Sequence, residues 1–89
     1  MTTIIANMDL HDLEYKIYII EDSAIVNEFT ADKDIFADRV LDCYTSNQAE
    51  KIILNGNDLL TYHYEKEIRK KETNYAVSNI KIERTNIRE

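Results

Sequence analysis

The chain contains no proline and a single glycine, Gly56, among its 89 residues. Proline and glycine mark turns and flexible connections, so their scarcity predicts short loops and a chain made mostly of helices and strands. The presence of only one cysteine, Cys43, excludes an internal disulfide. The sequence also lacks a secretory hydrophobic region and any run of about 18 apolar residues, the length that a membrane-spanning helix needs. We therefore expect a cytoplasmic protein in a reducing compartment.

Length and composition bound the architecture. A chain of 89 residues, 44% of them apolar and 31% charged, is typical of one folded domain. We expect this domain to span residues 1–89, with 83–89 frayed. A domain of this size buries only about 60–65% of its unfolded surface, so a monomer is marginally stable. Dimerisation or partner binding would add stability.

The net charge of −6 is unevenly distributed along the chain. Residues 1–50 carry 11 Asp and Glu against 3 Lys and Arg, a net charge of −8. Residues 51–89 carry 6 against 8, a net charge of +2. Direct nucleic-acid binding requires a broadly basic face, which this chain does not offer. The asymmetry favours an acidic surface that meets a basic partner, or chains that dock head to tail.

Hydrophobic periodicity predicts a β-β-α-β-α-β order with an extra strand in front. Apolar alternation or short apolar runs predict strands at 2–6, 14–21, 24–30, 51–54 and 75–83. The run at 51–54 is continuous, as in a strand inside a covered sheet, whereas 24–30 has one polar face, as near an edge. Helical periodicity predicts helices at 32–44, capped by Thr30 or Asp32, and at 58–72. The fold class is therefore α/β, a mixed sheet of four or five strands with two helices packed on it.

The stretch KIILNGNDLL, residues 51–60, has the strand–turn–helix form of a phosphate-binding loop. Such loops need several glycines, and often a following Lys-Ser or Lys-Thr, so that backbone amides and a lysine surround the anion. This stretch has one glycine, and Asp58 stands where an anion would bind. We therefore interpret it as a plain turn, with Gly56 at positive φ and Asn57 or Asp58 capping the helix.

The most distinctive polar feature is an acidic stripe. Asp34, Asp38 and Asp42 recur at i, i+4 and i+8, so three carboxylates would line one side of the first helix. Three further carboxylates would extend this surface if the hairpin lies nearby: Asp22, Glu28 and Asp32. The stripe is either a solvated helix face or a patch that binds a Lys/Arg-rich surface by imitating the charges of a nucleic-acid backbone.

Catalytic and metal-binding arrangements are less well supported. Asp9, His11 and Asp12 are suitable ligand types, but their spacing matches no known metal geometry. Asp9 and Asp58 both follow predicted strands. Nucleases of the ribonuclease-H-like type use strand-end carboxylates around two metals, a resemblance that is only topological here. Cys43 lies next to Asp42, which would raise its pKa, so we interpret it as a packed thiol.

We therefore predict a small acidic protein-binding or inhibitor module that docks on a basic protein partner, without a cofactor. Compact, charge-polarised chains of this kind occur among phage and mobile-element inhibitors, which is an analogy. One alternative is a metal-dependent phosphodiesterase that uses Asp9 and Asp58. Another is a homo-oligomeric module, such as a dimer, in which the acidic half of one chain meets the basic segment 66–71 of its neighbour.

Overall fold

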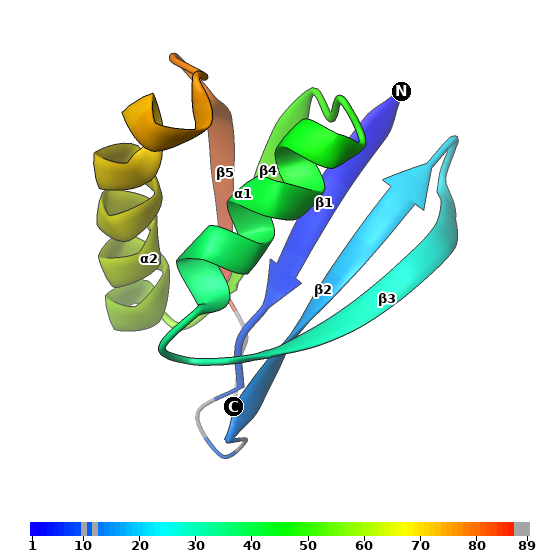
Figure 1. Ribbon diagram of the computed structural model, residues 1–89. Helices are drawn as coiled ribbons and strands as arrows, with labels where there is room; N and C mark the ends of the chain where they lie inside the picture. The colour runs from blue at the N-terminus through cyan, green and yellow to red at the C-terminus, as the bar shows by residue number, and fades with distance from the viewer. Residues whose placement is uncertain (10, 12, 87–89) are drawn as a thin grey trace.

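The computed structural model describes residues 1–9, 11 and 13–86. It contains five strands, two α-helices and one short 3-10 helix (Figure 1). Their order and bounds are β1 (Thr2–Asn7), β2 (Glu14–Glu21), β3 (Ala24–Asp32), α1 (Phe36–Ser46), β4 (Lys51–Gly56), α2 (Asp58–Lys71), η1 (Thr73–Tyr75) and β5 (Lys81–Asn86). The predicted α/β class, with a mixed sheet and two helices, is confirmed.

The strands form one sheet in the order β3-β2-β1-β4-β5. β1, β4 and β5 run parallel to one another, whereas β2 is antiparallel to both of its neighbours, β1 and β3. β1 is thus the middle strand, and the hairpin β2–β3 forms one side of the sheet.

Both helices cover the same face of the sheet, as Figure 1 shows. The connections β3–α1–β4 and β4–α2–β5 each join parallel strands, and both move across the sheet in the same direction. Because such crossovers are right-handed, both helices must lie on one side. The opposite face of the sheet, which we call the open face, is therefore covered by neither helix.

The core lies between the helices and the covered face. Three aromatic side chains, Tyr15, Phe36 and Tyr64, meet edge to face with ring centroids 5.0–5.7 Å apart. They join β2, α1 and α2. Fully buried aliphatic side chains extend this core along the strands and helices: Ile4, Ile17, Val40, Leu41, Ile52, Leu54 and Ile68.

Two predicted elements are displaced by several residues. α1 begins at Phe36, because β3 stays paired with β2 as far as Asp32 and the chain then turns. Ile35 is the N-cap residue and makes no side-chain cap, so neither Thr30 nor Asp32 caps the helix. The last strand is not at 75–83 but begins at Lys81, and residues 84–86, expected in the frayed tail, pair in parallel with β4.

The turn after β4 differs from the prediction at one residue. Gly56 does not have a positive φ; it is the buried last residue of β4. A Cβ there would lie 3.3 Å from Cβ of Met8, so close packing explains the glycine. The predicted capping role of Asn57 is confirmed, because its side-chain oxygen accepts a hydrogen bond from Leu60 N–H at 2.9 Å.

Candidate functional site

Strand β3 is an exposed edge of the sheet. Eight of its nine residues are exposed, Ala31 being the buried one. Half of the large apolar side chains exposed among the described residues lie on β3 or in the turn after it: Ile25, Val26, Phe29 and Ile35. An edge strand of this kind presents unpaired backbone groups and apolar side chains to another chain.

A shallow groove of about 160 Å³ separates β3 from α1. Its lining combines an apolar ring with polar and charged groups: Phe29, Arg39, Asp42, Cys43, Ser46 and Asn47. A lysine or arginine side chain can lay its methylene stem against an aromatic ring while its charged head reaches a carboxylate. Phe29 and Asp42 offer those two contacts side by side.

Regular pairing on β3 is restricted to its second half. The register between β2 and β3 shifts between Ile19 and Ile20, which marks a bulge near the start of β3. Bulges twist an edge and interrupt its pairing. Residues 27–32 are therefore the regular part of the free edge. We call these residues, together with the groove beside α1, the β3 edge.

The β3 edge has carboxylates on both faces of the sheet. Asp42 lies in the groove on the helix side. Glu28 lies on the open face, where its carboxylate is 3.6 Å from Nζ of Lys16. Asp32 follows Glu28 at strand periodicity and pairs in register with Glu14, so it shares the open face. A strand added to β3 would thus meet a carboxylate on each of its sides, with Arg39 in the same groove as Asp42 and Lys16 beside Glu28.

The six carboxylates predicted to bind a partner do not form one continuous surface. Asp42, Glu28 and Asp32 flank the β3 edge, as described. Asp34 is exposed in the turn before α1. Asp22 lies in the β2–β3 turn, where it accepts a hydrogen bond from the N-terminal amine at 3.3 Å.

Asp38 is occupied within the fold. Its carboxylate accepts a hydrogen bond from Oη of Tyr75 at 3.0 Å and forms an ion pair with Lys71 at 3.2 Å. Burial, the bond to Asp38 and the nearby charge of Asp42 raise the pKa of Tyr75 to about 12. Asp38 therefore links α1 to α2 and η1, and the predicted helical stripe of three equivalent carboxylates does not form. Sequence reasoning missed this contact because 37 residues separate Asp38 from Tyr75.

No group of three or more His, Cys, Asp or Glu side chains that could hold a metal occurs among the described residues. Asp9 accepts a hydrogen bond from the backbone N–H of His11 at 2.9 Å, and Asp12 lies outside the described residues. Asp58 is the exposed first residue of α2. The carboxyl ends of the parallel strands carry neutral side chains that bond to one another: Asn55 donates to Asn7 at 2.6 Å, and Thr85 donates to Asn55 at 2.8 Å.

Cys43 is buried, with 6% of its surface exposed. Burial raises the pKa of its thiol; the charge of Arg39 opposes that rise and Asp42 adds to it. A neutral, buried thiol is a poor nucleophile, because the thiolate is the reactive form. Its position agrees with the packed thiol that the sequence indicates.

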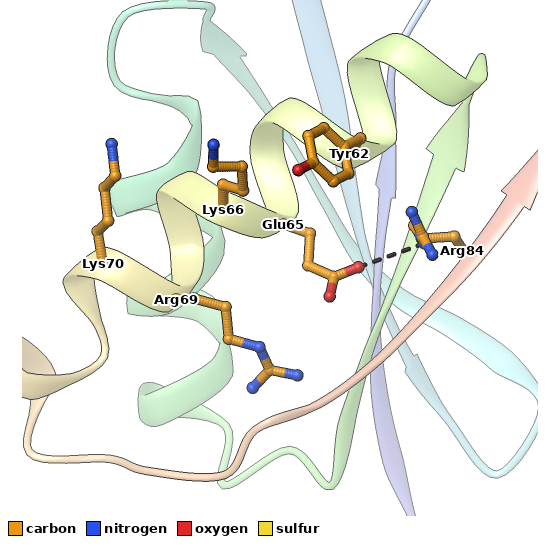
Figure 2. A pocket seen from close by; sticks show the side chains of 6 residues that line it. All are labelled: Tyr62, Glu65, Lys66, Arg69, Lys70 and Arg84. Atoms are coloured by element: carbon orange, nitrogen blue, oxygen red, sulfur yellow. Dashed lines mark ion pairs between the residues drawn. The ribbon is translucent and has the colours of Figure 1, made fainter.

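A larger pocket of about 350 Å³ lies on α2 beside β5 and is mostly basic. Figure 2 shows its lining: Tyr62, Glu65, Lys66, Arg69, Lys70 and Arg84. Several of these charged side chains already pair with groups of the same chain. Glu65 pairs with Arg84 at 3.3 Å, and Arg69 binds Glu72 and the carbonyl of Ile80, both at 2.6 Å.

Lysines of the basic segment 66–71 are likewise paired with carboxylates of the same chain. Lys70 pairs with Glu67 at 3.6 Å, and Lys71 pairs with Asp38 of α1. The acidic and basic halves of the chain thus already meet inside one molecule, which leaves little unbalanced positive charge there for a neighbouring chain.

The comparisons with known proteins add no functional information. No protein-family model matches the chain, and no curated protein sequence is similar to it. No helix in the described ranges is both long enough and apolar enough to cross a membrane. The β3 edge and its charges are therefore the features of the chain that bear on function.

Proposed function

We propose that the chain is a protein-binding module that pairs the free edge of β3 with an extended segment of a basic partner protein. By occupying that segment it would block or regulate the partner inside the cell, as small phage-type inhibitors do. The exposure of eight of the nine β3 residues is the observation that carries this proposal. Strand addition derives affinity from backbone hydrogen bonds and specificity from alternate side chains.

The charges around the β3 edge select the partner. Asp42 on the helix side, and Glu28 and Asp32 on the open face, favour a strand with Lys or Arg side chains on both of its faces. Phe29, with 36% of its surface exposed, offers an apolar contact for the stem of one of them. A basic segment with interspersed apolar residues fits this edge best. Because the carboxylates are not evenly spaced along a helix, recognition depends on strand pairing rather than on imitation of a phosphate backbone.

The test is affinity capture from the native cell with single charge reversals. Asp32→Lys and Asp42→Lys each invert a charge on one face of the β3 edge. Glu50→Lys makes the same charge change at an exposed residue before β4, on the far side of β2 and β1 from β3. We expect the two β3-edge variants to lose a partner that Glu50→Lys retains. We also expect that partner to dissociate as the screening length falls from about 10 Å at 0.1 M salt to about 3 Å at 1 M.

Hydrogen exchange on the captured complex tests the binding mode. Pairing on β3 should slow exchange of the backbone amides in residues 27–32, since the free-edge donors gain partners. A partner that binds without protecting these amides would contradict strand addition. A partner that all three charge-reversal variants bind equally well would contradict the proposed site.

A further inference from the structure

The open face of the sheet carries a continuous apolar stripe at its centre. Ile5 of β1 pairs in register with Tyr18 of β2 on one side and with Ile53 of β4 on the other. Ile20 lies two residues beyond Tyr18 on the same face of β2. All four side chains are partly exposed. We call Ile5, Tyr18, Ile20 and Ile53 the open-face stripe.

The central strands β1 and β4 have the sequences of strands that are covered on both faces. Strands of all-parallel sheets, which are buried on both faces, carry near-continuous apolar runs, and β1 and β4 likewise carry isoleucine toward both sides. Ile4 and Ile52 face the helices and are fully buried. Ile5 and Ile53 face away from the helices, which both pack on the other side (Figure 1). The described residues provide no second layer over Ile5 and Ile53.

The charges on the open face indicate what kind of partner could cover it. Although the chain has a net charge of −6, most charges on the open face form close pairs of opposite sign, the exceptions being Glu14 and Asp32 near its β3 margin. Lys16 pairs with Glu28 at 3.6 Å, and Glu83 pairs with Lys51 at 3.4 Å and with Lys81 at 3.9 Å. A face on which most charges are paired with the opposite sign does not strongly repel a copy of itself.

We propose that the open face is the interface of a homodimer, in which two sheets pack face to face and the open-face stripes meet. This dimer differs from a head-to-tail contact between acidic and basic halves, because its centre is apolar. It also uses a surface other than the groove of the β3 edge. The backbone edge of β3 and the Asp42 groove stay accessible in the dimer, whereas Glu28 and Asp32 lie on the open face and would be shared between the dimer interface and the proposed partner.

The area of the open face suits a specific dimer. Five strands spaced about 4.8 Å apart span roughly 24 Å, and six residues at about 3.3 Å each span roughly 20 Å. With all five strands taking part, the flat area is about 480 Å² per copy, or roughly 960 Å² for both, which is close to the lower limit of about 1,000 Å² for a specific interface. Because β1 is the middle strand, a two-fold axis through the centre brings Ile5 close to Ile5 of the second copy.

Sedimentation equilibrium of the purified chain tests the dimer. We expect the wild type to be dimeric and to remain so at about 1 M salt, because screening weakens charge pairs but not apolar contacts. Ile5→Lys and Ile53→Lys each place a charge in the stripe and should give monomers. Leu13→Lys, at a side chain that is 87% exposed, is the matched control and should stay dimeric. Circular dichroism verifies that each variant is folded.

Chemical cross-linking gives a second readout that does not depend on disruptive variants. Packed sheets lie about 10 Å apart, too far for a disulfide but within reach of a short bis-maleimide. In a Cys43→Ser background, Ile5→Cys should cross-link into a dimer and Leu13→Cys should not. A wild type that is monomeric at its highest soluble concentration would overturn the proposal. So would a dimer that dissociates in salt, or one in which Leu13→Cys cross-links as well as Ile5→Cys.

Discussion

Replacement of Phe36 by leucine tests the aromatic centre of the core. Phe36 is fully buried, and its ring centroid lies 5.0 Å from that of Tyr15 and 5.1 Å from that of Tyr64. Each edge-to-face pair contributes about 0.5–1.5 kcal/mol beyond burial, so two pairs contribute about 1–3 kcal/mol. The smaller side chain also leaves a partly filled space. We expect Phe36→Leu to lower the free energy of unfolding by about 2–3 kcal/mol.

That loss is large for a chain of this length. At about 0.05–0.15 kcal/mol per residue, 89 residues give a total stability of roughly 4–13 kcal/mol. A loss of 2–3 kcal/mol should lower the Tm by about 8–24 °C, since 1 kcal/mol corresponds to about 4–8 °C in a domain of this size. Urea unfolding followed by circular dichroism measures the free energy, and a thermal scan measures the Tm.

The same chemical change at the sheet edge provides the control. Phe29 is not one of the three clustered rings and is 36% exposed, so Phe29→Leu should change stability by less than about 0.5 kcal/mol. The reasoning would be refuted if Phe36→Leu cost less than about 0.5 kcal/mol, or if the two variants were equally destabilised. Both chains must be compared at one concentration, because dimerisation would add to the apparent stability.

Two further predictions concern alkaline pH and the start of α2. Burial is the main cause that raises the pKa of both Tyr64 and Tyr75 from 10.0 to about 12 in the folded chain. The folded state thus favours the neutral phenols. Their contribution to the free energy of unfolding is complete below pH 10 and is lost as the pH rises toward 12. Urea unfolding at pH 9 and at pH 11 would measure this loss. A midpoint unchanged between these pH values would contradict the prediction. Asn57→Ala should cost about 1 kcal/mol of unfolding free energy, because Leu60 N–H loses its cap, whereas Asn57→Asp, which can still accept that bond, should cost much less.

Elements with a strong apolar pattern could be predicted from the sequence. β2 has the predicted bounds, because Tyr15, Ile17 and Ile19 recur on one face, Tyr18 and Ile20 recur on the other, and a glutamate stands at each end. α2 ends one residue before its predicted end, at Lys71. The edge position of β3 also followed from its polar face. In each case the pattern of a short segment decides which side is buried.

Elements that depend on distant contacts could not be predicted. Most of the side chains of β5 are polar, so its strand state comes from parallel pairing with β4 rather than from its own pattern. The apolar residues Tyr75, Val77 and Ile80 suggested a strand, but they pack against the core from the connection before β5. The contacts of Asp38 could not be predicted for the same reason, since Tyr75 and Lys71 come from segments more than 30 residues away.

The charge asymmetry of the sequence is only partly available to a partner. In the folded chain, Asp38 is neutralised by Lys71, and the acidic first half and the basic second half meet where α1 contacts α2. The strand order and the crossovers decide which charged surfaces a partner can reach. Strand order places β3 at the edge with Asp32 on one face and the Asp42 groove on the other. Same-handed crossovers leave the open face uncovered. Among the described residues no ion pair engages Asp32 or Asp42, although Asp42 also interacts with the hydroxyl of Tyr75. Reversing Asp38 should instead reduce folding stability, through loss of its bonds to Lys71 and Tyr75, before it alters partner recognition.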